Sequence, residues 1–293
     1  MIIDSHQHVF WHGLDDAGLV ADMDACGVDL AWLLTWEIHP DEDRPDRHGI
    51  LNPLHARDNG THGGIPLSDL ITARNNYPDR FILGYCPHPA VGDAPSLLEA
   101  AYRTHGVRVC GEFKHRVLMD DPRSLNLLRK AGELGYPVVL HLDVPFLPGE
   151  KVEREYQPNW YGGTVENLER ALQACPDTVF VGHAPGFWRE ISGDAGCDGA
   201  QYPRGPISAG GRVQVLLEKY ANLYADLSAG SGLYALQRDT DHARKFLVQF
   251  ADRLLFARDG YGNDLKEYLD SLDLPPEIYK KIFSQNAQRL VQL

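Results

Sequence analysis

The sequence predicts a single α/β domain folded as a (β/α)8 TIM barrel, with long loops at the carboxyl ends of its strands. Short apolar segments recur along the chain, and amphipathic helical patterns separate them. The length of 293 residues is close to the roughly 250 residues typical of this barrel. Hydrophobic residues make up 43% of the chain, enough for a sizeable core. No linker, low-complexity tract or repeat divides it, so we expect one domain over residues 1–293.

Eight segments are predicted to be strands because they are short and rich in β-branched and aliphatic residues. Runs such as Val138–Leu140 are typical of strands buried on both faces of a parallel sheet. The predicted strands cover residues 2–7, 29–35, 81–86, 107–113, 137–142, 178–183, 222–227 and 254–258. Eight parallel strands predict a closed barrel.

Several helices between the strands have clear apolar stripes and terminal signals. The expected helices are Leu67 to Tyr77, Ser124 to Gly135, Thr164 to Ala174 and closing helices within 277–293. Ser68 is a candidate N-cap of the first, and Gly135 suits the end of the second. Thr164 is followed three residues later by Asn167, which favours a helix start there.

Three connections are longer than typical loops: residues 36–65, 143–163 and 184–209. All three follow a predicted strand, and barrel enzymes build their sites at that end of the strands. We therefore expect these segments to enclose a substrate. The histidines of the first are His39, His48, His55 and His62. We expect most of them to be solvated surface residues and leave open that one or two reach the substrate.

Charge and composition limit the partners. Lys plus Arg number 28 against 41 Asp plus Glu, a net charge of −13 that would repel a nucleic acid backbone. No apolar run approaches the roughly 18 residues needed to span a bilayer, and no secretory start is apparent. The cysteines lack paired spacing, which favours a reducing cytoplasm: Cys26, Cys86, Cys110, Cys175 and Cys197. We expect a small-molecule substrate. The sequence does not exclude a homo-oligomer.

Potential metal ligands stand at the ends of four predicted strands. Alternating side chains on a strand share a face, so His6 and His8 in His6-Gln7-His8 could hold one ion. His141, His183 and Asp259 end three further strands. A single such histidine could be only a hydrogen-bonded edge or loop residue, and Asp259 could instead cap a helix starting near residue 264.

Carboxylates beside these strands offer further roles. Strict alternation places Arg108, Cys110, Glu112 and Lys114 on one face of the fourth strand. A buried charge needs a partner, which a metal site supplies. A Glu112–Lys114 ion pair without metal contact is the alternative. Asp226 and Asp4 are candidates to orient a ligand imidazole, and Asp226 could equally cap the turn that follows it.

The order of these residues resembles the amidohydrolase superfamily of metal-dependent barrels. The closing Asn286-Ala287-x-Arg289-Leu290 is similar to its amidohydrolase-related branch, which includes the aminocarboxymuconate semialdehyde decarboxylases. The resemblance implies that His6, His8 and Asp259 bind a first metal ion. It also implies that His141 is a further ligand in a mononuclear site, or that His141 and His183 hold a second ion.

The resemblance also implies roles on the fourth strand and in catalysis. Gly111-Glu112 is similar to members that bind a second metal with a glutamate there, so we favour Glu112 over Lys114 as this ligand. The ligand set suits one or two Zn²⁺ ions, although Mn²⁺, Fe²⁺ and Ni²⁺ also fit. Asp259 would shuttle the proton of an activated water, and His183 would stabilise an oxyanion.

These roles predict a metal-dependent hydrolase of a small amide, ester or lactone. The alternatives are a mononuclear decarboxylase or hydratase, which needs no bridging residue, and a small-molecule phosphoesterase, which needs two ions. Lys114 is expected to hold a substrate carboxylate. Residues in or near the mouth loops are further candidates for substrate contact: Arg116, Tyr156, Trp160, Tyr161 and Trp188.

Overall fold

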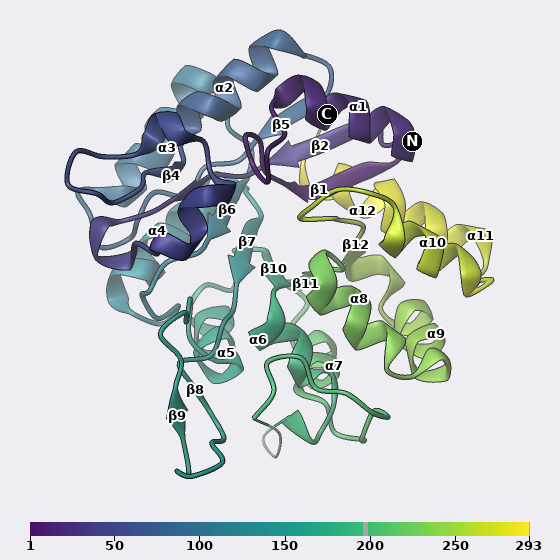
Figure 1. The fold of residues 1–293 in the computed structure, drawn as a ribbon. Coiled ribbons are helices and arrows are strands. Elements are labelled where there is room, and N and C mark those ends of the chain that lie inside the picture. The colour runs from purple at the N-terminus through teal and green to yellow at the C-terminus, as the bar shows by residue number, and fades with distance from the viewer. Residues whose placement is uncertain (196–198, 293) are drawn as a thin grey trace.

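The computed structural model describes residues 1–195 and 199–292, and it arranges parallel strands in a ring with helices outside them (Figure 1). The eight principal strands are β1 (Ile3–Gln7), β2 (Leu30–Leu33), β5 (Phe81–Leu83), β6 (Cys110–Phe113), β7 (Val138–His141), β10 (Phe180–His183), β11 (Leu223–Asp226) and β12 (Leu254–Leu255). They lie at the predicted places, and all eight are shorter than predicted. Their pairing runs β1-β2-β5 in one sheet and β12-β11-β10-β7-β6 in the other.

Backbone hydrogen bonds join these two sheets at both edges. Between β5 and β6, the Arg108 amide donates to the Leu83 carbonyl at 2.9 Å. Between β12 and β1, the Ser5 amide donates to the Phe256 carbonyl at 3.0 Å. The order β1 to β12 therefore closes on itself, and the predicted barrel is confirmed.

The helices follow the strands and cover the outside of the barrel (Figure 1). They are α1 (Asp16–Cys26), α2 (Leu67–Asn76), α3 (Ala94–His105), α4 (Pro122–Glu133), α5 (Val165–Ala174), α6 (Pro185–Trp188), α7 (Arg212–Lys219), α8 (Ala229–Gln237), α9 (Thr240–Gln249), α10 (Asp264–Ser271), α11 (Pro276–Lys280) and α12 (Asn286–Leu290). Thr164 and Asn167 form the capping box of α5, as the sequence predicts. The Ser68 cap is wrong, because α2 already begins at Leu67 after Pro66.

The long connections at the mouth contain short elements of their own. Residues 36–65 hold β3 (Trp36–Glu37), β4 (Gly64–Ile65) and three 3₁₀ turns, Pro40–Glu42, Pro45–Ile50 and Pro53–His55. Residues 143–163 form a projecting hairpin of β8 (Phe146–Leu147) and β9 (Glu155–Tyr156) (Figure 1). These segments are ordered loops fastened to the barrel rather than linkers.

Two apolar clusters form the core. The larger one fills the layer between strands and helices, while a smaller one of Ile3, Trp32, Leu34, Val109, Val139, Val181 and Leu255 fills the barrel interior. Ala287 and Val291, from the predicted closing helices, belong to the interior cluster. The Asn286 side chain donates to the carbonyls of Ala251 and Leu254, both at 2.7 Å. The last helix thus fixes the end of the barrel away from the mouth.

Other sequence expectations can be placed briefly. Cys26, Cys86, Cys110 and Cys175 are free thiols, and Cys197 lies outside the described residues, as does Leu293 of the predicted closing segment. Within the described chain, no helix is both long and apolar enough to cross a bilayer.

Arg258 follows β12 and forms ion pairs with Asp4 of β1 and with Asp22 of α1. Its Nε lies 2.7 Å from Asp4 Oδ2, and its Nη1 lies 2.6 Å from Asp22 Oδ2. Asp4 is fully buried and also accepts the backbone amides of His6 and Arg258. Asp4 therefore positions backbone, and the expectation that it orients an imidazole is wrong.

We predict that Arg258→Leu lowers the free energy of unfolding by about 3–5 kcal/mol, because Asp4 loses its buried counter-charge. Chemical denaturation followed by circular dichroism measures this change. The control is Lys266→Ala, which removes the exposed Lys266–Asp270 pair and should cost under about 0.5 kcal/mol. Equal small losses in both variants would contradict a structural role for Arg258.

Candidate metal centre

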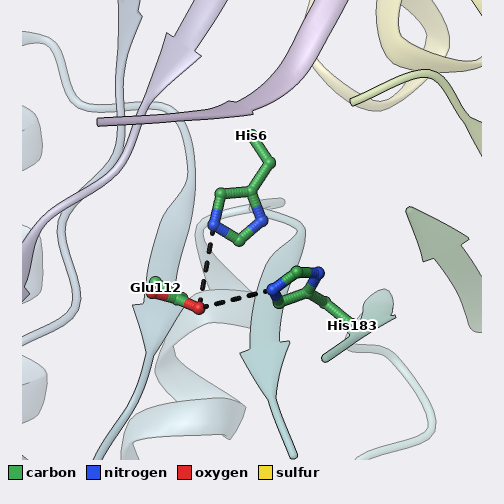
Figure 2. A group of neighbouring side chains, drawn as sticks. All are labelled: His6, Glu112 and His183. Atoms are coloured by element: carbon green, nitrogen blue, oxygen red, sulfur yellow. Dashed lines mark ion pairs between the residues drawn. The ribbon is translucent and has the colours of Figure 1, made fainter. Parts of the chain in front are cut away.

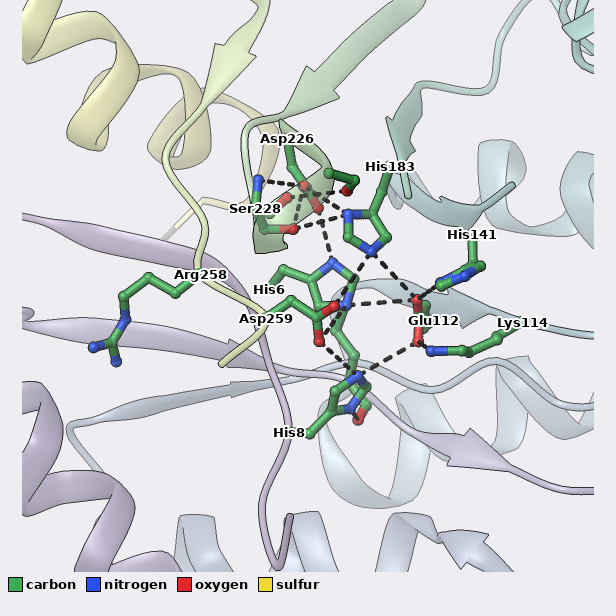
Figure 3. Close-up of polar contacts among 12 residues, drawn as sticks. His6, His8, Glu112, Lys114, His141, His183, Asp226, Ser228, Arg258 and Asp259 are labelled. Atoms are coloured by element: carbon green, nitrogen blue, oxygen red, sulfur yellow. Dashed lines mark hydrogen bonds and ion pairs between the residues drawn. The ribbon is translucent and has the colours of Figure 1, made fainter. Parts of the chain in front are cut away.

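The ends of six strands bring histidines and carboxylates together at the mouth of the barrel (Figure 3). The converging residues are His6 and His8 from the end of β1, Glu112 from β6, His141 from β7, His183 from β10, Asp226 from β11 and Asp259 after β12. All are buried except Asp259, which keeps slight exposure. The geometry therefore gathers every residue predicted as a metal ligand into one cluster.

His6, His8 and Asp259 form a first group of possible ligands. Their nearest ligand atoms all lie within 4.8 Å of one another. Asp259 Oδ1 lies 3.8 Å from His6 Nε2 and 3.6 Å from His8 Nε2. These separations are compatible with ligands about 2.0–2.2 Å from one shared ion.

His6, Glu112 and His183 form a second group (Figure 2). Glu112 Oε1 lies 3.7 Å from His6 Nε2 and 3.8 Å from His183 Nε2. Its other oxygen, Oε2, lies 3.4 Å from His8 Nε2. Glu112 Oε1 therefore faces two histidines of its own group, and Oε2 faces His8 of the first group.

His141 contacts Glu112 directly instead of joining either group. Its Nδ1 lies 2.7 Å from Glu112 Oε1, and its Nε2 lies 2.9 Å from Asp143 Oδ2. The ring is thus held between two carboxylates at the edge of the second group.

Asp226 orients two of the ligand imidazoles. Its Oδ2 lies 2.8 Å from His6 Nδ1, and its Oδ1 lies 3.0 Å from His183 Nδ1. His8 is fixed in the same manner by the Leu34 carbonyl, 2.8 Å from its Nδ1. With their Nδ1 atoms engaged, the three rings aim Nε2 into the cluster, as metal-binding histidines do. Asp226 also accepts the Ser228 amide at 3.0 Å, so it both orients the rings and caps the turn.

Unpartnered polar atoms in this cluster fit a divalent cation. His6 Nε2, His8 Nε2, Glu112 Oε2 and Asp259 Oδ1 are buried without a hydrogen bond among the described residues. Leaving buried polar atoms unpaired costs free energy, and imidazole nitrogens and carboxylate oxygens are the ligands that zinc prefers. The donors present therefore suit a metal ion of this kind.

Charge coupling in the cluster is strong. Burial would raise the pKa of Asp259, but the neighbouring His6 and His183 outweigh it and hold that pKa well below its usual range. Burial would lower the pKa of His183, but Asp226 and Asp259 outweigh it and raise that pKa to about 10. His183 and Asp259 therefore favour each other's charged forms.

An irregularity in β6 turns Glu112 towards the mouth. The register of β6 against β7 shifts between Cys110 and Phe113, and such a bulge re-aims side chains. Arg108 instead lies over the Tyr102 ring of α3, at 5.1 Å, and Cys110 packs in the outer core. The prediction that Arg108 and Cys110 share the face of Glu112 is therefore wrong.

Lys114 reaches the same region. Its Nζ lies 3.4 Å from Glu112 Oε2 and 4.3 Å from the centre of the Trp36 ring. The Glu112–Lys114 ion pair, which the sequence offered as an alternative to metal binding, is therefore present. Glu112 faces the histidines as well.

Beside the cluster lies a cavity of about 270 Å³. His141, His183 and Asp259 open onto it, and Lys114, Arg44, Arg47, Trp11, Trp36 and Tyr161 are among its walls. Sequence reasoning missed Arg44 and Arg47. The only signal was their place in a long loop after a strand.

Other predicted contact residues do not line this cavity. The Arg116 amide donates to Glu42 Oε1 at 2.7 Å, and Tyr156 is 55% exposed on the projecting hairpin. Trp160 is absent from the walls as described. Trp188 is buried and donates from Nε1 to the Asp226 carbonyl at 3.0 Å. It therefore contacts the backbone of a residue that orients the ligands, and it does not line the cavity.

Asp259 does not cap the following helix, because Asn263 occupies the N-cap position of α10. Four residues within four positions of a strand end have positive φ angles without being glycine: Phe10 (53°), Ala184 (78°), Ala229 (56°) and Asp259 (46°). Such strained backbone is often found where the surrounding structure holds a functional site.

Comparisons with solved structures show proteins of the same fold. A putative 2-pyrone-4,6-dicarboxylic acid hydrolase from Pseudomonas putida is 17% identical, with a TM-score of 0.60 over 99% of this chain and 96% of that one. A 2,6-dihydroxybenzoate decarboxylase from Rhizobium is 18% identical, with a TM-score of 0.57 over 99% and 98%.

A third such structure is 5-carboxyvanillate decarboxylase from Novosphingobium aromaticivorans, solved as a mutant with bound manganese. It is 17% identical, with a TM-score of 0.56 over 96% of this chain and 82% of that one. No curated protein matches the chain.

The family comparison covers nearly the whole sequence. The model of the amidohydrolase family matches residues 3–293, which include every residue of the cluster at the mouth. The chain therefore belongs to the amidohydrolase family of metal-dependent enzymes.

Proposed function

We propose that this enzyme is a binuclear metal-dependent hydrolase of a small ester, amide or lactone. One observation carries the proposal: Glu112 belongs to the second group through Oε1, which faces His6 and His183, and it also faces His8 of the first group through Oε2. A carboxylate in this position suits a bridge between two cations. Divalent ions such as Zn²⁺ would lower the pKa of a water molecule and polarise the substrate carbonyl.

Asp259 and His183 are the residues proposed to move protons and stabilise charge. Asp259 opens onto the cavity and its neighbours keep it ionised, so it can accept a proton from water and pass it to the leaving group. His183 Nε2 lies 3.4 Å from Asp259 Oδ2 and also opens onto the cavity. If Nε2 does not bind an ion, it is placed to donate to an oxygen that becomes negative during attack.

The walls of the cavity favour a substrate that carries a carboxylate. Arg44 and Arg47 line the cavity from the long loop of residues 36–65, and Lys114 lines it from the position directly after β6. The Arg44 guanidinium is paired with Asp46, at 2.6 Å, whereas Arg47 has no ion pair within residues 1–195 and 199–292. A guanidinium without an ion-pair partner can bind a carboxylate of a substrate. Two of the compared structures are named for carboxylic acids, 2,6-dihydroxybenzoate and 2-pyrone-4,6-dicarboxylic acid.

A mononuclear decarboxylase is the second candidate. Two of the compared structures are decarboxylases, one with manganese. The 2.7 Å contact between His141 and Glu112 would persist in such a site, where Glu112 need not bind a metal. The number of ions that depend on Glu112 distinguishes the two reactions.

We predict that Asp259→Asn lowers turnover by at least about 100-fold, because the proton acceptor is lost. Initial rates on a panel of carboxylated esters and lactones measure the change. Asp264→Asn is the control, since this exposed residue begins α10 and does not line the cavity. Wild-type turnover in Asp259→Asn with metal still bound would remove Asp259 from the reaction.

We predict that Glu112→Gln lowers the metal content by about one ion per chain relative to wild type, because two cations lose part of their shared negative charge. Plasma mass spectrometry after dialysis against limiting chelator gives the count. Glu133→Gln, on the exposed end of α4, is the control. Equal counts in wild type and Glu112→Gln would exclude the binuclear hydrolase and favour the decarboxylase.

We predict that Arg47→Gln raises KM at least about tenfold for a carboxylated substrate, equivalent to about 1.4 kcal/mol of binding, with little change in kcat. The methyl ester of the same carboxylate should show no such change. Arg103→Gln, on the outer surface of α3, controls for loss of charge. An equal effect on the acid and its ester would contradict a carboxylate contact.

A further inference from the structure

A second cluster of imidazole and carboxylate groups lies in the loops beside the mouth. Glu42 ends the 3₁₀ turn Pro40–Glu42, His88 follows β5, and His115 follows β6. None of the three lines the cavity as described. Three loops that are distant in sequence therefore meet at this cluster.

The spacing of these groups fits a single ion. Their ligand atoms all lie within 4.8 Å of one another. Glu42 Oε1 lies 3.0 Å from His88 Nε2, and Glu42 Oε2 lies 3.9 Å from His115 Nδ1. Ligands bound tetrahedrally at about 2.0–2.2 Å would stand roughly 3.4 Å apart, so small side-chain movements suffice.

His115 supplies an independent observation. The residue is 1% exposed, and neither of its ring nitrogens makes a well-formed hydrogen bond to a described residue. Its polar neighbours include His88, Glu42, Glu112 and the Cys86 backbone. An imidazole buried in this way lacks compensation for its lost hydration, and Nδ1 faces the Glu42 carboxylate.

We propose that Glu42, His88 and His115 bind a zinc-like divalent cation that is separate from the catalytic centre. Two imidazoles and one carboxylate are a common zinc ligand set that leaves a position for water. The ion would fasten the long loop of residues 36–65, which carries Arg44 and Arg47, to the ends of β5 and β6. It is a structural site, and it does not rest on the proposed hydrolase activity.

Binding requires one local rearrangement. His88 Nδ1 now accepts the Ala90 amide at 3.1 Å, so in the neutral ring Nε2 carries the proton and donates to Glu42. An ion at Nε2 needs that proton on Nδ1, and the Ala90 amide must then turn to solvent. Ala90 is exposed, so water can replace the lost partner.

Zinc titration of the chelator-treated full-length protein, in competition with a chromogenic chelator, tests the site. We expect His88→Gln to bind about one Zn²⁺ fewer per chain than wild type. His105→Gln, at the exposed end of α3, should match wild type. The same loss should appear when His88→Gln is added to a His6→Ala/His8→Ala variant, which isolates it from the catalytic centre. Equal zinc binding with and without His88→Gln overturns the proposal.

A second measurement does not depend on the folding of any variant. Crystals of the wild-type protein grown with Zn²⁺ are measured on both sides of the zinc absorption edge. An anomalous peak between Glu42, His88 and His115 supports the site. A map with a peak only among His6, His8, Glu112 and Asp259 overturns it and leaves the catalytic centre intact.

Discussion

The metal centre depends on the contacts of one carboxylate, Asp226, with two histidines. Both oxygens of this buried carboxylate are engaged, one with His6 and one with His183. Burial would raise the pKa of Asp226, but these two rings outweigh it and keep the pKa far below its usual range. A permanently charged anchor behind the rings fixes which nitrogen of each faces the cluster. Without it, ligands from β1 and β10 would have no common orientation.

The tightly packed interior of the barrel, below the mouth, holds this polar arrangement in place. The interior is filled by aliphatic side chains, one tryptophan and the last helix, while the polar groups are confined to the ends of the strands. Deviations from regular geometry gather at the same end, in the register shift of β6 and in the positive φ of Asp259. Strained or irregular backbone persists where a rigid scaffold holds it, so the irregularities and the ligands occur together.

Charge is distributed unevenly over the molecule. The chain has a net charge of −13, yet the cavity carries Lys114, Arg44 and Arg47. These cations share the cavity walls with Asp259, one of the carboxylates that would bind metal. The long loop that supplies the two arginines is also the loop held by Glu42 beside His88 and His115. The two arginines that line the cavity and the Glu42 contact with His88 therefore belong to one segment of chain.

The sequence determined the order of strands and helices, the closed barrel, and the placing of His6, His8, His183 and Asp259 at one end of it. Those conclusions depend on local patterns, namely apolar runs and the alternation of side chains along a strand. Alternation also produced the error on the fourth strand, because a bulge is set by pairing with β7, which no local pattern records.

Only the tertiary structure decided which loop residues reach the cavity. Arg44 and Arg47 line it, whereas Arg116 and Tyr156 do not. It alone also showed that Glu42, His88 and His115 meet. Loops take their course from contacts between segments far apart in sequence, so the positions of their side chains are fixed by the assembled fold.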